Sequence, residues 1–197
     1  MLPRSGGPAG NAVLTAWTGS VLLVLFLIEM ATLLNVKALM SWHVVVGILL
    51  VPPALLKTAS TLWRFAGYYL HRAPYHEAGP PPMLLRMLGP LVVLSTLGLL
   101  GTGLALIALG PESSRLELFS VVGRRVTAVR LHQLTFVLWA GVTGLHTAGR
   151  LVPALRILSS RSTVPGGRAR GALVAVMLVF AGIASVALFG ASGSWRG

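Results

Sequence analysis

Two histidines lie near the ends of one long uncharged stretch, Leu131–Gly149. His132 and His146 are 14 positions apart, close to four helical turns, so on a helix they share one face with roughly 20 Å between them. An ionisable side chain inside an apolar membrane span is costly and usually has a function. Stacked histidines on one membrane helix are typical of helices that present axial ligands to haem iron. This spacing therefore predicts haem ligation.

A third histidine, His43, lies in another uncharged stretch, Ala38–Leu56. As the second and fourth of five spans, the two stretches would cross a membrane in the same direction. His43 is the sixth residue of its stretch and His132 the second of its own, which predicts a similar depth near the outer surface. Imidazoles from two helices at one depth can bind one haem iron from both faces. We expect His43 and His132 to be the metal ligands of a first haem b.

Basic side chains flank these two histidines on the expected outer side. Guanidinium groups form strong paired hydrogen bonds with carboxylates, so they are suited to haem propionates. The residues expected to contribute to cofactor binding in this way, with help from a lysine, are Arg124, Arg125, Arg130 and Lys37.

The same 14-residue spacing leads from His43 to Lys57, where a two-haem protein would carry a fourth histidine. Three alternatives remain open. Lys57 is a border residue whose amine reaches the cytoplasmic surface, or its neutral amine completes a second haem with His146, or a loop histidine, His71 or His76, is the partner of His146. If a second haem is held by His146 with either of these partners, two further arginines would pair with its propionates: Arg64 and Arg150. One haem is expected, and a second stays open.

The composition identifies the elements that must position these residues. Mean hydropathy is +0.82, 55% of the residues are hydrophobic and 10% are charged, whereas about a quarter are charged in a typical soluble domain. We expect one all-α integral membrane domain, residues 1–197, with five transmembrane helices and the haem between the second and the fourth. The expected spans are residues 12–34, 38–58, 87–110, 130–150 and 171–192.

Charge and cysteine content restrict the chemistry and the orientation. The net charge of +12 would suit nucleic acid, but the arginines lie between apolar stretches, as in basic loops at a membrane surface, so no nucleic-acid partner is expected. With no cysteine, covalently attached c-type haem and Cys-held iron–sulfur clusters are excluded. Of the 16 Lys and Arg residues, 10 fall on the N-terminal side of five spans. The positive-inside rule then predicts a plasma (inner) membrane protein with a cytoplasmic N-terminus.

Two other features have a structural and a functional interpretation. Glu29 near the end of the first span is either a proton relay or quinone-site acid, or a carboxyl at the outer interface. Small residues in the third span would let a flat ligand or a second copy of the chain, in a homodimer, approach closely. They are Gly98, Gly101 and Gly103.

Three segments carry a resemblance to a known family. SWHVVVGILLVPPALLKTASTLWRFAGYYL, GPPPMLLRMLGPLVVL and LHQLTFVLWAGVTGLH resemble small actinobacterial membrane b-type cytochromes of the cytochrome b561-like group, over roughly residues 38–150. The resemblance implies electron transport with quinone, and haem ligation by His43, His132 and His146. Lys57 departs from the two-haem histidine pattern.

The expected function is one-electron transfer between membrane quinone and a partner protein or small acceptor, with one or two non-covalent haems. The protein would then be an electron-transfer protein or a subunit of a quinone-linked oxidoreductase. The alternative is a non-haem membrane scaffold or small transporter whose histidines handle protons or metal ions.

Overall fold

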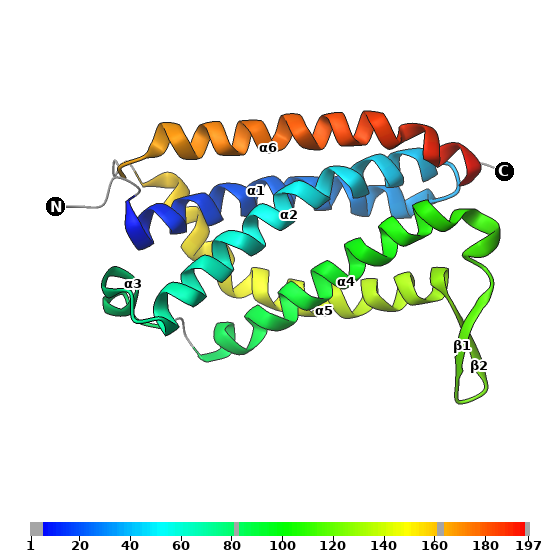
Figure 1. Cartoon of the computed structure of the whole chain (residues 1–197), viewed down its shortest axis with the longest axis horizontal. Coiled ribbons are helices and arrows are strands. Elements are labelled where there is room, and N and C mark those ends of the chain that lie inside the picture. Colours follow the sequence, from blue (N-terminus) through cyan, green and yellow to red (C-terminus); the bar gives the residue numbers. More distant parts are fainter. Residues whose placement is uncertain (1–5, 81–82, 161–163, 196–197) are drawn as a thin grey trace.

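The computed structural model describes residues 6–80, 83–160 and 164–195. Within these ranges, five long helices run along the molecule (Figure 1). They are α1 (Gly7–Thr32), α2 (Met40–Tyr69), α4 (Met83–Ser113), α5 (Ala128–Ser159) and α6 (Gly167–Leu188). Each of the five expected spans coincides with one of them. The chain is therefore an all-α bundle, and α2 continues without a break through Pro52 and Pro53.

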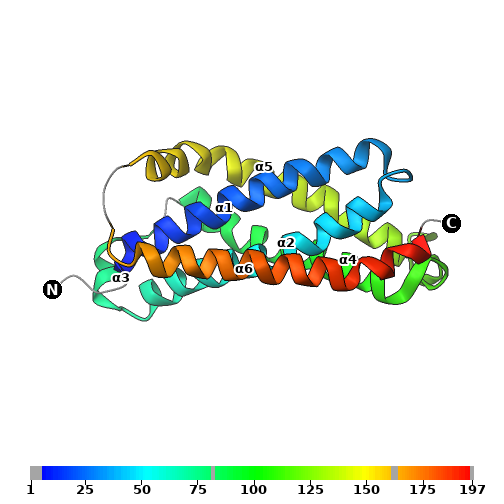
Figure 2. The same cartoon turned by 90° about the horizontal axis from the view of Figure 1, so that it is seen from above.

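The helices pack as two antiparallel pairs with one additional helix. α1 packs along α2 and α4 packs along α5, whereas contacts between the two pairs, α1 with α5 and α2 with α4, are fewer. α6 packs against α2 on the outside of this four-helix arrangement (Figures 1 and 2). α2 and α5 both begin at the end of the bundle where α6 ends, so the expected parallel orientation of these two helices is present (Figure 1).

The surface of the bundle has the composition of a membrane protein. Among the described residues, four helical segments are long and apolar enough to span a bilayer: α1 with the following turn, α2, α4 and α6. α5 is as long but less apolar, since its apolar stretch includes His132, Gln133 and His146. Large apolar side chains such as Leu94 and Phe180 are exposed on the outside, and hydroxyls such as those of Thr18 and Ser185 are buried inside. This inverted pattern suits helices that pack through small polar residues in lipid.

Short elements connect the helices. They are η1 (Leu33–Asn35), α3 (Ala73–Glu77), β1 (Glu117–Val121), β2 (Arg124–Thr127) and η2 (Phe189–Trp195). α3 lies between the second and third expected spans and contains His76, a residue expected in a loop; Pro81 and Pro82, before α4, are outside the described residues. The charge count that predicts orientation also includes three residues outside them, Arg4, Arg161 and Arg196.

The connection between α4 and α5 is a β-hairpin that extends away from the end of the bundle (Figure 1). It joins the helices of the third and fourth expected spans, residues 87–110 and 130–150. Val122 and Gly123 at the turn both have positive φ, 49° and 71°, which is the backbone of the tight turns that match strand twist. The hairpin leads directly into α5, where the Thr127 side chain accepts a hydrogen bond from the backbone amide of Arg130 (3.2 Å) and caps the helix. This cap, five residues before His132, fixes where α5 starts.

Candidate functional site

His43 and His132 lie next to each other inside the bundle. Their ring centres are 6.4 Å apart and the ring planes are inclined by 79°. Each histidine is in the first two turns of its helix, and both side chains are half-buried. The packing of α1–α2 against α4–α5 thus brings together the two residues that the sequence predicts as partners at one depth.

The Nδ1 atom of His43 is held by two residues of α1. It lies 2.9 Å from Oε1 of Glu29 and 3.1 Å from Oγ1 of Thr32. The Thr32 hydroxyl donates its single proton to the backbone carbonyl of Glu29 (2.6 Å), so it can only accept from His43. Because a carboxylate also accepts, Nδ1 carries the proton and Nε2 keeps its lone pair in the neutral ring.

The Nδ1 atom of His132 is in an equivalent arrangement with α4. It lies 2.9 Å from the hydroxyl of Thr102. That hydroxyl donates to the backbone carbonyls of Gly98 (2.8 Å) and Leu99 (3.0 Å), which leaves it as an acceptor from the imidazole. His132 is therefore also protonated on Nδ1, with the lone pair on Nε2.

The two rings thus have the tautomer that binds a metal ion through Nε2. The side-chain partners of both histidines, Glu29, Thr32 and Thr102, all lie at Nδ1. Two imidazoles that bind one metal ion from opposite sides, through nitrogens at about 2.0 Å, have ring centres roughly 6 Å apart, close to the separation of His43 and His132. Orientation of ligand histidines through hydrogen bonds at the other ring nitrogen is the usual second layer of a metal site. These residues fit a haem iron held from both faces.

A glycine beside each histidine permits this close packing. A Cβ atom on Gly103 would lie 3.3 Å from Cε1 of His132, and one on Gly47 would lie 3.6 Å from Oε1 of Glu29. The first distance is tighter than ordinary van der Waals contact. Gly103 thus lets α4 approach the imidazole of His132 closely enough for the bond to Thr102.

The residues considered for a second haem, Lys57, His146, Arg64 and Arg150, are near one another but are not arranged like the pair His43 and His132. Lys57 and Arg150 are the charged groups that act electrostatically on His146, and Arg64 acts in the same way on Arg150. The Lys57 amine nevertheless donates to the backbone carbonyl of Thr15 on α1 (3.3 Å). Its end also occupies the space where a Cβ on Gly19 would lie, 2.7 Å away. The Nδ1 atom of His146 is buried without a hydrogen-bond partner in the described structure.

His71 lies at the other end of the bundle from His43, beyond the end of α2 (Figure 1). Its ring centre is 4.8 Å from that of His76, which stacks on Tyr68 at 5.4 Å. Both histidines are exposed. The described residues contain no group of three or more His, Cys, Asp or Glu side chains able to hold a metal ion. The two loop histidines therefore lie next to each other. In the described part of the chain, no hydrogen bond or ring contact joins either of them to His146.

The outer basic residues lie around the hairpin and the helix starts. Arg124 and Arg125 are on β2, and the Nε atom of Arg125 pairs with Oε2 of Glu117 across the hairpin (3.2 Å). Arg130 is exposed in the first turn of α5, and Lys37 is exposed just before α2. Arg130 and Lys37 are thus at the same end of the bundle as the histidine pair, whereas the two arginines of β2 are on the projecting hairpin.

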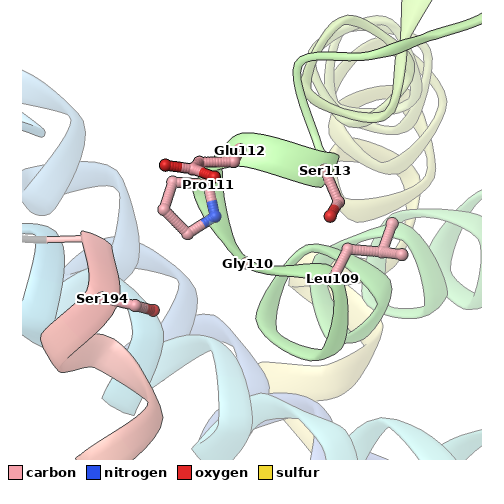
Figure 3. A pocket seen from close by; sticks show the side chains of 6 residues that line it. All are labelled: Leu109, Gly110, Pro111, Glu112, Ser113 and Ser194. Atoms are coloured by element: carbon pink, nitrogen blue, oxygen red, sulfur yellow. The ribbon is translucent and has the colours of Figure 1, made fainter.

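Two hollows lie near these elements. One, of about 180 Å³, is between α1 and α5 and is lined by Leu23, Phe26, Trp139, Ala140, Thr143, Gly144 and Thr147. The other, of about 420 Å³, is a wide surface depression where α4 bends at Gly110 (Figure 3). Its lining residues are Leu109, Gly110, Pro111, Glu112, Ser113 and Ser194. Neither hollow is lined by His43 or His132.

Thr32 and Thr102 are the site residues that the sequence analysis does not identify. A sequence signal exists for Thr102, since it lies inside the glycine cluster of the third span, where close approach of another helix is expected. Thr32 follows Glu29 by one helical turn, which places the two side chains on one face of α1. Comparison of the chain with family models, with curated proteins and with solved structures gives no match. The functional argument therefore rests on the geometry of the site.

Proposed function

We propose that the protein is a membrane b-type cytochrome, similar to the cytochrome b561-like group, with a non-covalent haem between α2 and α5. His43 and His132 would hold its iron. One observation carries the proposal: two imidazoles from different helices lie with ring centres 6.4 Å apart, and each is held at Nδ1 in the tautomer that leaves Nε2 for iron. Bound haem would supply a reversible one-electron carrier.

The surrounding side chains have defined tasks in this proposal. Glu29 and Thr32 hold the His43 ring, and Thr102 holds the His132 ring, so that both ligands are preorganised before the cofactor arrives. Arg130 and Lys37 are the cations at this end of the bundle that would pair with propionates. α5 serves as the fifth span, because haem covers the polar histidine that lowers its hydropathy.

The proposed activity is electron transfer between membrane quinone and a partner protein or small acceptor, in the plasma membrane with the N-terminus in the cytoplasm. Quinones are soluble in the bilayer that the apolar helices require, which supports this choice of donor or acceptor. We limit the proposal to one haem, because the Lys57 amine already has a backbone partner on α1. His146 is then a half-buried histidine near two cations and not an iron ligand.

The decisive experiment is a pyridine haemochrome assay with protein quantitation on the detergent-purified chain from haem-replete cells. One haem b per chain, with a low-spin spectrum, is the expected result. Two haems per chain would establish the inner site and with it electron transfer across the bilayer. No haem would reject the cytochrome proposal in favour of a scaffold or a proton or metal-ion transporter.

A further inference from the structure

The carboxyl group of Glu29 is enclosed in the bundle beside one of the two histidines. Its side chain is 14% exposed, and Oε1 lies 2.9 Å from Nδ1 of His43. The second oxygen, Oε2, is buried and has no hydrogen-bond partner in the described structure. A carboxyl group placed so deeply in an apolar segment is costly, so a role at its neighbour is expected.

We propose that Glu29 is a positioning residue that sets the reduction potential of the haem through His43. Its carboxylate accepts the Nδ1 proton of His43 and places one negative charge behind this ligand. This inference rests on the haem proposed above, and it concerns a property that the ligand set alone does not determine.

The two ligands differ in the charge of the group behind them. His132 donates to the neutral hydroxyl of Thr102, whereas His43 donates toward a carboxylate and a hydroxyl. Hydrogen bonds to a charged acceptor are roughly twice as strong as those between neutral groups. His43 is consequently the more electron-rich ligand, and only its side of the site carries a buried acid among the described residues.

The effect of the Glu29 charge on the reduction potential follows from the change in charge of the iron. Reduction adds one electron to the iron, from the ferric to the ferrous state, with both Fe–N bonds retained and no proton transferred. A fixed negative charge nearby, in a low-dielectric interior, favours the more positive ferric state. Glu29 therefore lowers the reduction potential, and removing its charge must raise it.

Glu29→Gln tests the role of the charge while keeping an acceptor. The amide oxygen of Gln can still accept from His43 Nδ1, so haem content and the low-spin spectrum should match those of the original protein. The equilibrium constant for reduction, measured by spectroelectrochemical titration at fixed pH, should rise at least tenfold, which is 59 mV for one electron. Glu117→Gln is the matched control, because it makes the same change of carboxylate to amide on the exposed hairpin, where Glu117 pairs with Arg125, and its shift should stay below threefold.

Glu29→Asp separates charge from side-chain length. It keeps the carboxylate, so the equilibrium constant for reduction should stay within threefold of the original value. Equal haem content with a shift below threefold in Glu29→Gln would overturn the inference and leave the cytochrome proposal intact. A tenfold shift in both variants would also overturn it, because the charge would then not be the cause.

The two variants also decide the case in which Glu29→Gln loses its haem. Retention of haem at an unchanged potential in Glu29→Asp would then support the charge, and loss in both would reduce Glu29 to a packing role. A protein that purifies without haem before any substitution would reject the proposed function itself.

Discussion

The Nζ atom of Lys57 lies 3.3 Å from the backbone carbonyl oxygen of Thr15. This bond joins α2 to α1 at the level where a second pair of haem ligands would be expected from the 14-residue spacing. It turns the lysine away from a ligand role and toward helix packing. Hydrogen bonds between polar groups of neighbouring helices help to hold membrane helices together.

Substitution of Lys57 tests this packing role. Lys57→Met keeps most of the apolar stem but removes the amine, and we expect haem content and the absorption spectrum to stay unchanged. Thermal unfolding in detergent should show a loss of about 1 kcal/mol, the usual value of one hydrogen bond. If the original protein binds two haems and Lys57→Met binds only one, the packing role would be contradicted and Lys57 would be established as a haem ligand.

His43→Ala and His132→Ala should each abolish haem binding. Each substitution removes one of the two imidazoles whose ring centres are 6.4 Å apart, so haem would lose one of the two protein bonds to its iron. The pyridine haemochrome assay measures the effect. His146→Ala is the matched control on α5 and should keep a full complement of haem. A normal low-spin spectrum in either of the first two variants would refute this pair of ligands.

Thr102→Val should weaken the site without removing a ligand. Valine has nearly the shape of threonine but cannot accept from Nδ1 of His132, which loses a bond of 2.9 Å. We expect about 1 kcal/mol of destabilisation and faster loss of haem in a competition assay. Thr102→Ser retains the hydroxyl and should behave like the original protein. Equal rates of haem loss in both variants would mean that the hydroxyl does not orient the ring.

Gly110 has a φ of +74° where α4 bends. Its ψ of 172° places it in a backbone region that essentially only glycine adopts, where a side chain costs of order 1–3 kcal/mol, so Gly110→Ala should lower the thermal unfolding temperature. Gly101→Ala is the control within α4, since Gly101 has helical dihedral angles, is not followed by proline, and has open space around an added Cβ. That substitution should be neutral or slightly stabilising. Equal effects of both changes would show that the bend does not depend on the glycine.

The orientation in the membrane can be tested with single cysteines, because the chain has none of its own. Ser120 on the hairpin and Ala78 after α3 are exposed at opposite ends of the bundle (Figure 1). With the N-terminus in the cytoplasm, Ser120→Cys should react with a membrane-impermeant maleimide on intact spheroplasts. Ala78→Cys should react only after permeabilisation. The reverse labelling pattern would place the N-terminus outside.

The sequence predicts the five helices because long stretches without charge have few other solutions in a protein of this composition. It does not predict the end of every helix. α5 continues to Ser159, since polar and charged residues can extend a helix beyond its apolar part. The hairpin is missed because its strands are short and largely exposed, so no burial pattern marks them before the turn at Gly123.

The pairing of His43 with His132 follows from counting residues along two parallel helices. Their partners Thr32 and Thr102 do not follow in this way. α1 and α4 are apolar on nearly all sides, so the sequence contains no hydrophobic stripe that fixes their rotation about the helix axis. Which face of α1 meets His43 depends on packing against α2, and this becomes visible only in three dimensions.

The division of the bundle into two helix pairs determines an order of assembly. α1 with α2 and α4 with α5 are neighbours in the chain, so each pair can form as its two segments enter the bilayer. The fewer contacts between the pairs then form last. His43 belongs to the first pair and His132 to the second. A ligand that binds both histidines would therefore stabilise the packing of the two helix pairs against each other, the final step of folding. In a cell that lacks this ligand, we expect chains to accumulate whose helices are inserted but whose two pairs are not packed together.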